Sequence, residues 1–192
     1  MTDQELLDLL KQRGALMEGH FKLASGMHSN RYVEKFRLLE DPVTTGRMIE
    51  ELAKRIRKYE PDVVVGPVTG GVILSFEMAR HLGTLAYFTE KTTDGGMELR
   101  RGFDVEGKRV LLIEDVITTG GSILKAADAV KAAGGIVAAY AILVDRSSGR
   151  FAPEEPVEAL LSLEIQTWQP DNLPPELAAI PLVEPGSKHA RR

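Results

Sequence analysis

The chain has 192 residues, 43% of them hydrophobic, and its 24 basic and 28 acidic side chains give a formal net charge of −4. That length suits one domain with a sizeable core, and the nearly balanced charge predicts neither a nucleic-acid nor an acidic-membrane partner. The sequence has no cysteine, which excludes disulfides, thiolate metal sites and cysteine nucleophiles, and no apolar run reaches the roughly 18–20 residues that span a bilayer, so we expect a soluble, cytoplasmic protein.

The first 40 residues predict a short helix followed by a small strand-containing element. Thr2 and Glu5 have the spacing of a capping box, and the helix that they open stops near Gly14. Residues 19–38 are rich in turns and alternate between apolar and polar side chains. His20 and His28 lack a partner at metal-site spacing, so we expect them at the surface.

From residue 41 onward, helices and strands alternate. Asp41 followed by Pro42 is typical of a helix start, and short apolar runs with glycine-rich turns then predict further strands and helices. The expected strands are residues 63–65, 85–89, 109–114 and 136–144; the expected helices are about 72–82 and from about 122 to Gly134. Three consecutive β-branched residues at 63–65 indicate a strand buried on both faces. This order predicts an α/β fold with a mostly parallel central sheet flanked by helices.

The most informative stretch is residues 110–122, with the sequence VLLIEDVITTGGS. An apolar strand leads to Glu114 and Asp115, and hydroxyl side chains and glycines follow where a helix starts. Hydroxyls and free backbone N–H groups at a helix N-terminus bind phosphate, whereas carboxylates accept hydrogen bonds from sugar hydroxyls and contact Mg²⁺ through water. A ligand with a phosphate at one end and a diol at the other, such as ribose-5-phosphate, satisfies both halves.

Other interpretations of this stretch fit less well. An ordinary capped helix explains one hydroxyl and one glycine, but not two carboxylates beside an apolar strand. The lysine of an ATPase phosphate loop and the GxGxxG pattern of a dinucleotide fold are both missing. A phospho-accepting aspartate would need an acidic cluster on the first core strand, where Asp62 stands alone.

Residues 110–122 resemble the phosphoribosyl pyrophosphate (PRPP) signature of the type I phosphoribosyltransferases. The resemblance implies that Glu114 and Asp115 hold the ribose 2′ and 3′ hydroxyls and take part in catalysis. It also implies that the loop after them wraps the 5′-phosphate; this loop consists of Val116, Ile117, Thr118, Thr119, Gly120, Gly121 and Ser122. In the same family the turn after the first core strand holds pyrophosphate, which assigns PRPP binding to Thr69 and Gly70.

The family resemblance also implies a single domain over residues 1–192. Its core would span about 41–150, and a small hood would combine about 1–40 with the C-terminal segment 151–192. Residues 90–102 would form a mobile lid that reaches the other subunit of a homodimer and brings cations to the pyrophosphate. Orotate enzymes have a lysine-rich lid with a histidine. That histidine is missing here, so we expect Lys91 to be the catalytic cation and to bind PRPP. Arg100 and Arg101 are the alternative candidates for the catalytic cation.

Two further features resemble the orotate phosphoribosyltransferases within this family. Residues 19–32 contain the F-x-L-x-S-G-x-x-S element of their hood, although Ala24 stands where many of them have lysine. Arg146 after the fourth core strand would bind the orotate carboxylate through its guanidinium fork, and Thr118 would lie near the base. The implied substrates are orotate and PRPP, and PRPP would carry Mg²⁺ with it. A purine phosphoribosyltransferase and a non-catalytic PRPP- or nucleotide-binding regulator remain alternatives.

Overall fold

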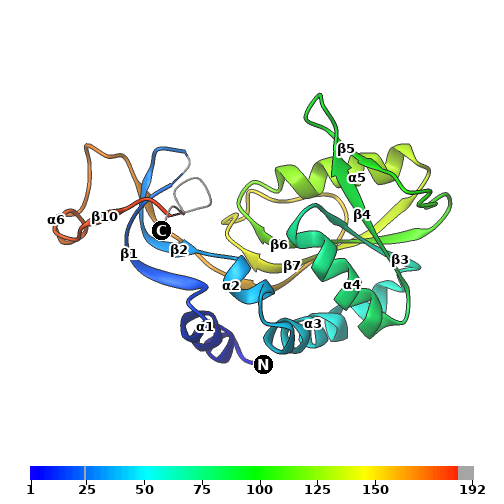
Figure 1. The fold of residues 1–192 in the computed structure, drawn as a ribbon, viewed down its shortest axis with the longest axis horizontal. Helices are drawn as coiled ribbons and strands as arrows, with labels where there is room; N and C mark the ends of the chain where they lie inside the picture. Colours follow the sequence, from blue (N-terminus) through cyan, green and yellow to red (C-terminus); the bar gives the residue numbers. More distant parts are fainter. Residues whose placement is uncertain (24, 186–192) are drawn as a thin grey trace. The chain divides into compact units, whose positions relative to one another are not determined.

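The computed structural model describes residues 1–23 and 25–185, which form two compact units (Figure 1). The smaller unit combines residues 1–40 with the chain from residue 164 onward, and the larger unit is residues 41–163. The sequence analysis placed the start of the C-terminal hood segment near residue 151, whereas the compact units divide after residue 163. Residues 157–162 form a strand that pairs in parallel with strand 136–145 of the larger unit's sheet. This pairing makes the segment part of the larger unit.

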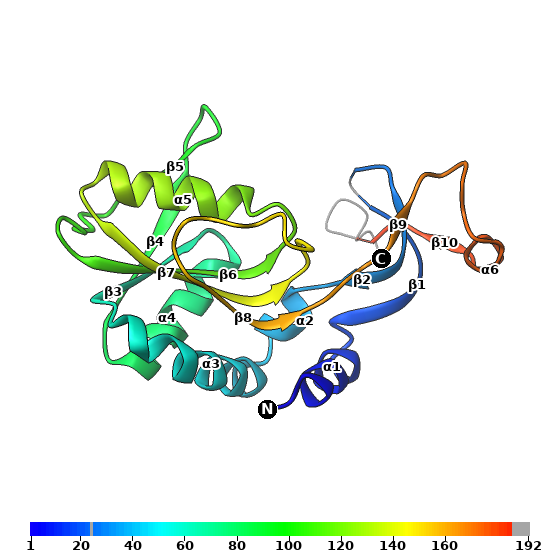
Figure 2. The same cartoon turned by 180° about the vertical axis from the view of Figure 1, so that it is seen from behind.

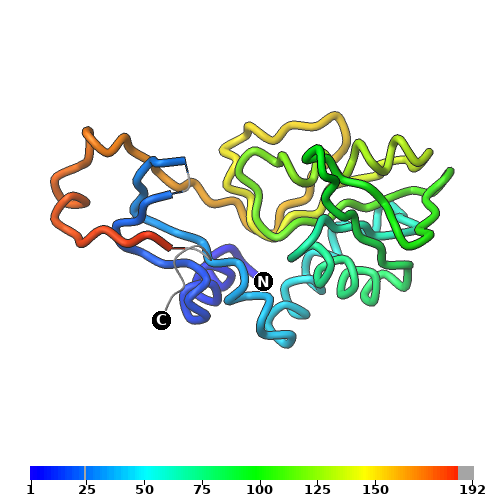
Figure 3. The backbone as a smooth tube through the Cα atoms, turned by 45° about the horizontal axis from the view of Figure 1, so that its top comes forward, coloured from blue at the N-terminus to red at the C-terminus, as the bar shows by residue number. Residues whose placement is uncertain are grey.

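The smaller unit is built on a four-stranded sheet with the strand order β10-β1-β2-β9. Its elements are α1 (Asp3–Gln12), β1 (Leu16–Lys22), β2 (His28–Val33), α2 (Phe36–Leu39), β9 (Thr167–Trp168), α6 (Pro175–Ala178) and β10 (Leu182–Val183). The capping box of Thr2 and Glu5 is present as predicted. Figure 3 shows the C-terminal segment beside the N-terminal strands, where β10 pairs in parallel with β1.

The expectation that His20 and His28 lie at the surface is wrong. His20 is 4% exposed and His28 is 8% exposed. Nε2 of His20 lies 2.7 Å from Nδ1 of His28, and Nδ1 of His20 lies 3.0 Å from the carbonyl oxygen of Ile180. The C-terminal segment supplies this last partner from 160 residues away in the chain, which is why the local sequence pattern does not reveal the burial.

The larger unit is an α/β layer structure around a six-stranded sheet with the order β5-β4-β3-β6-β7-β8. Its strands are β3 (Val63–Pro67), β4 (Leu85–Lys91), β5 (Met97–Leu99), β6 (Arg109–Ile117), β7 (Ile136–Asp145) and β8 (Val157–Ser162); its helices are α3 (Pro42–Ile56), the 3-10 turn η1 (Arg57–Tyr59), α4 (Gly70–Leu82) and α5 (Gly121–Ala132). All pairings are parallel except that of β5 with β4. Figures 1 and 2 show α3 and α4 on one face of the sheet and α5 on the other.

Local signals explain most of these elements. Asp41 accepts a hydrogen bond from the backbone N–H of Val43 and caps α3, and Gly83 ends α4 in the left-handed conformation. Residues 63–65 are fully buried, as the β-branched run predicted. Two features differ from the expectation. β6 continues to Ile117 instead of ending at residue 114, and residues 97–99 form a short antiparallel strand. Among the described residues, no helix is both long enough and apolar enough to cross a membrane.

Candidate functional site

A cavity of about 500 Å³ lies in the larger unit, at the end of β6 and the start of α5. It is lined by Lys91, Gly95, Gly96, Met97, Glu114, Val116, Ile117, Thr118, Thr119, Gly120, Gly121, Ser122, Ile123 and Lys125. The cavity therefore brings together Lys91, Glu114 and the whole predicted phosphate loop, 116–122. It lies beyond the carboxyl end of a central strand, where ligands bind in open parallel sheets.

The N-terminus of α5 lies at the cavity and has the chemistry to attract an anion. Gly120 is the N-cap residue, with φ of +74°, and no side chain caps the first N–H groups of the helix. A Cβ atom at Gly120 would lie 2.2 Å from Cδ2 of Phe151, so both the backbone conformation and the packing require glycine. N–H groups left uncapped at a helix N-terminus attract anions, and the hydroxyls of Thr118, Thr119 and Ser122 line the same cavity.

The two acidic residues lie in β6 itself and are both buried. Glu114 is 7% exposed and Asp115 is 2% exposed. Successive side chains of a strand point to opposite faces, and Glu114 lines the cavity whereas Asp115 is not among its lining residues. An Asp115 carboxylate oxygen accepts a hydrogen bond of 2.7 Å from the backbone N–H of Val116, which orients that side chain at the strand end. Glu114 is thus the acidic side chain placed to receive a hydroxyl in this cavity.

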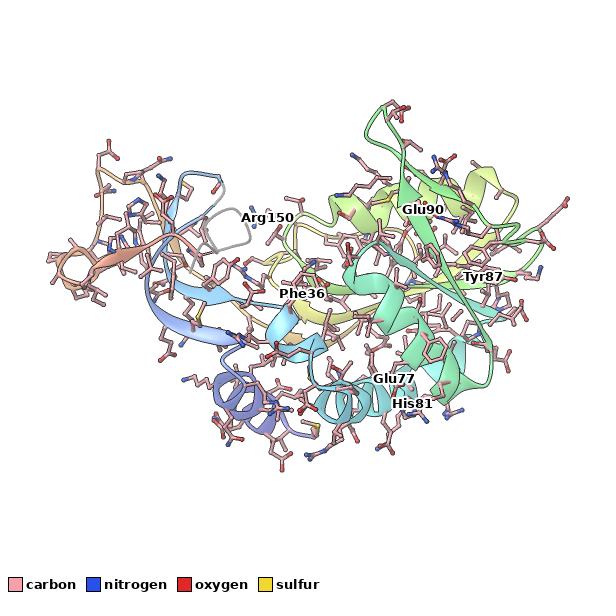
Figure 4. All side chains as sticks on the ribbon, viewed as in Figure 1. Phe36, Glu77, His81, Tyr87, Glu90 and Arg150 are labelled. Carbon is pink, nitrogen blue, oxygen red and sulfur yellow. The ribbon has the colours of Figure 1, made fainter. Side chains whose placement is uncertain are left out.

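The predicted lid is a β-hairpin in which β4 pairs with β5 and Lys91 lies opposite Met97. Lys91 lines the cavity and makes no ion pair with any residue in the part of the chain that the structure describes. Arg100 pairs with Glu98, and Nε of Arg101 lies 2.8 Å from Oε1 of Glu90, the residue labelled on β4 in Figure 4. Because both arginines are occupied within the hairpin, Lys91 is the lid cation that faces the cavity.

The hydrogen bond and positive charge of Arg101 hold the pKa of Glu90 below its ordinary value. Arg100 adds to this effect from 3.7 Å, measured from Nη1 to Oε2 of Glu90. A cluster of one carboxylate and two guanidinium groups therefore stabilises the base of the hairpin.

Thr69, Gly70, Arg100 and Arg146 do not line this cavity. Thr69 and Gly70 lie where β3 turns into α4, and the turn is tight, since a Cβ atom at Gly66 would lie 2.0 Å from the carbonyl oxygen of Gly71. The backbone N–H of Arg146 donates to the carbonyl oxygen of Ile117 at 2.9 Å. Because β3, β6 and β7 are neighbours, the loops that follow them lie along one edge of the sheet.

Sequence reasoning missed Lys125 as a site residue. Its Nζ donates a hydrogen bond of 2.6 Å to the carbonyl oxygen of Gly95 at the hairpin tip, and both residues line the cavity. The available signal was its position four residues after Gly121, which places the two on the same face of α5.

Part of the hood element has a structural explanation within the smaller unit. Gly26 has φ of +82° in a turn closed by the hydrogen bond from the N–H of Leu23 to the carbonyl oxygen of Met27. The fully buried Ser29 hydroxyl donates to the carbonyl oxygen of Gln166 at 2.9 Å. Gly26 and Ser29 of the hood element therefore have structural roles in the smaller unit. Ala24, which stands in place of the usual lysine, lies outside the described residues.

Comparisons with known proteins find similar sequences and similar folds among phosphoribosyltransferases. The family model described as phosphoribosyl transferase domain matches residues 39–179. A curated orotate phosphoribosyltransferase of Rhizorhabdus wittichii is 48% identical over 194 residues, covering 99% of this chain and 98% of the relative. A second, from Desulforamulus reducens, is 42% identical over 189 residues and 98% of each chain. The crystal structure of orotate phosphoribosyltransferase from Aeropyrum pernix matches with a TM-score of 0.71 and 28% identity, over 82% of this chain and 93% of that one.

Proposed function

The chain belongs to the phosphoribosyltransferase family, and on this premise we propose that it transfers ribose-5-phosphate from PRPP to orotate. The products are orotidine 5′-monophosphate and pyrophosphate, in a step of pyrimidine biosynthesis. The observation that carries this proposal is the cavity that combines the uncapped N-terminus of α5 with the buried carboxylate of Glu114. The names of the full-length relatives supply the base, orotate.

The cavity suits the ribose-5-phosphate half of PRPP. Backbone N–H groups of the phosphate loop and the hydroxyls of Thr118, Thr119 and Ser122 bind the 5′-phosphate. Glu114 accepts hydrogen bonds from the ribose hydroxyls, and Asp115 orients the start of the phosphate loop by accepting the hydrogen bond from the backbone N–H of Val116. The pyrophosphate lies toward Thr69 and Gly70, since their loop follows the strand next to β6.

In the reaction, the bond between ribose C1 and a pyrophosphate oxygen breaks and its electron pair leaves with pyrophosphate. A ring nitrogen of orotate then bonds to C1 and gives up its proton to the departing pyrophosphate or to water. Positive charge develops on the ribose and negative charge on the leaving group, so catalysis consists mainly of positioning and charge neutralisation. Lys91, which faces the cavity from the hairpin, neutralises the pyrophosphate. Mg²⁺ enters as part of the substrate complex with PRPP, as is usual for an ion that prefers phosphate oxygens and water.

Arg146 and Thr118 bind orotate in this proposal. Arg146 follows β7 and Thr118 follows β6, and the hydrogen bond from the N–H of Arg146 to Ile117 ties these two strand ends together. A guanidinium group binds a carboxylate through two parallel hydrogen bonds, which distinguishes orotate from bases without a carboxylate.

The functional unit in this proposal is a cytoplasmic homodimer. Exposed apolar side chains on neighbouring helices support association: Val43 on α3 is 73% exposed, and Ile73 and Phe76 on α4 are 44% and 68% exposed. Apolar side chains that form a contiguous exposed patch commonly mark an interface. Light scattering after size-exclusion chromatography should give a dimer for the wild type and a monomer for Phe76→Glu; a wild-type monomer would contradict the proposal.

The deciding experiment follows the loss of orotate by ultraviolet absorbance with PRPP and Mg²⁺ present. We expect loss that requires both additions and that disappears in Asp115→Asn and in Arg146→Ala. Turnover with a purine base in place of orotate would keep the PRPP site and overturn the choice of base. PRPP binding without turnover of any base would instead favour the regulator.

A further inference from the structure

Lys125 connects the helix that carries the phosphate loop to the tip of the β4–β5 hairpin. Its hydrogen bond to Gly95 has no local origin, since the two residues are 30 positions apart. The tip itself is closed by hydrogen bonds from the N–H of Thr92 to Gly96 and from the N–H of Gly95 to Thr92, each 3.2 Å long. The Lys125–Gly95 hydrogen bond, called the latch below, therefore holds an already formed turn against α5.

The latch is located where a bound phosphate would compete for it. Lys125 lies one helical turn after Gly121, on the face of α5 that leads to the N-terminus, and both residues line the cavity. The competing acceptor, the carbonyl of Gly95, is neutral. A phosphate in the loop carries full negative charge, so it adds Coulomb attraction to the hydrogen bond and is the better partner for this ammonium group.

Asp94 places a negative charge at the hairpin tip, next to the latch. The pKa of Asp94 is lowered, chiefly by the hydrogen bond from the Thr92 hydroxyl, with further contributions from the backbone N–H of Gly96 and from the charge of Lys125. Asp94 is therefore ionised at neutral pH, and the positive charge of Lys125 favours keeping the tip close. When the Lys125 ammonium group binds a phosphate instead, the tip loses the hydrogen bond and the phosphate charge offsets this attraction.

We propose that Lys125 is a positioning residue that holds the hairpin tip against α5 in the ligand-free protein and releases it when the 5′-phosphate of the substrate takes over its ammonium group. The identity of that ligand rests on the proposed function. Binding of the phosphate end of PRPP is thereby coupled to freedom of the segment that carries Lys91, so that the lid is released when there is a substrate to cover.

Because the chain has no cysteine, one Thr93→Cys substitution places a spin label specifically on the exposed tip of the hairpin. Label mobility is measured by electron paramagnetic resonance, with and without ribose 5-phosphate, in chains with the native Lys125, Lys125→Met or Lys125→Arg. Lys131→Met is the matched control, since Lys131 lies on the same helix and pairs with Glu155 at 2.7 Å. Calorimetry records binding of ribose 5-phosphate in parallel.

With Lys125 in place, we expect a restrained label that becomes mobile when ribose 5-phosphate binds. Lys125→Met should be mobile with or without ligand, whereas Lys125→Arg and Lys131→Met should keep the ligand response. In turnover assays, Lys125→Met should raise the KM for PRPP about tenfold and leave the KM for orotate unchanged, because one charge-assisted hydrogen bond to phosphate is lost.

Equal mobility of the ligand-free native and Lys125→Met chains would overturn the latch, whatever the enzyme's activity. Ligand binding that leaves the label restrained would overturn the release step. If the native chain binds no ribose 5-phosphate and shows no turnover, the proposed function and the release step both fail. The ligand-free comparison still decides the latch, so the two failures are distinguishable.

Discussion

Gly120 and Phe151 lie so close together that a single methyl group at Gly120 would come within 2.2 Å of the Phe151 ring. The first residue is the N-cap of α5, and the second closes the core beneath it, where it packs edge-on against Tyr140 with ring centroids 5.3 Å apart. The phosphate loop is thus shaped by a residue outside the 110–122 motif.

Gly120→Ala should therefore destabilise the protein and weaken PRPP binding. The expected cost combines about 1–3 kcal/mol of overpacking with about 1–2 kcal/mol for a left-handed non-glycine residue. Gly121→Ala is the matched control, because its Cβ would meet only Thr119 Oγ1, at 3.7 Å. Thermal unfolding should show a fall of several degrees for the first variant only, at about 2–4 °C per kcal/mol. Adding Phe151→Ala to Gly120→Ala should remove the overpacking part; equal melting temperatures for the two glycine variants would contradict this account.

Lys91→Met should lower kcat about 100-fold or more, because a cation that neutralises the leaving group acts mainly in the transition state. Lys91→Arg should recover part of the loss. Arg101→Met removes a cation of the same hairpin that is already paired with Glu90, so its effect on kcat should stay below about tenfold. Steady-state kinetics at saturating PRPP and orotate check this order, and a larger loss in Arg101→Met than in Lys91→Met would reverse our assignment.

Ser29→Ala should reduce the stability of the smaller unit by about 0.5–1.5 kcal/mol, since the hydrogen bond from the buried Ser29 hydroxyl to the carbonyl of Gln166 would be lost. Ser25 belongs to the same sequence element but is exposed, and its hydroxyl only accepts a 3.4 Å hydrogen bond from Met27. Ser25→Ala is therefore the control, with an expected change below about 0.5 kcal/mol. Urea unfolding followed by fluorescence of Trp168 on β9 measures both, and similar losses would refute a structural role specific to Ser29.

The hairpin cluster around Glu90 should be insensitive to pH near neutrality. Arg101 keeps the folded pKa of Glu90 below the ordinary value of 4.5, so the stabilisation is fully present above that value and is lost as the pH falls through the folded pKa. Amide-exchange protection of β4 and β5, compared between wild type and Glu90→Gln, should differ constantly from about pH 6 to 8 and converge only as the pH falls through the folded pKa, which lies below 4.5. Convergence near neutral pH would show that the cluster is not what stabilises the hairpin.

The sequence by itself determined the order of the helices and strands in the core and the composition of the phosphate loop. These follow from short-range physics: the buried run at 63–65, the cap at Asp41, and hydroxyls and glycines placed where an apolar strand meets a helix. Glu114 and residues 116–122 could be chosen in advance because strand ends and helix starts are readable from local patterns, whereas Lys91 was chosen from the family resemblance, and the cavity does bring them together.

Only the tertiary structure decided which of these side chains face the cavity and what holds them there. The Lys125–Gly95 hydrogen bond, the contact of Phe151 with Gly120 and the burial of His20 against Ile180 each join residues that are far apart in the chain. Residues 157–162 likewise joined the central sheet through pairing with β7. Such contacts depend on how the helices and strands pack together in the tertiary structure. The local sequence pattern around either residue does not show which distant residue it will contact.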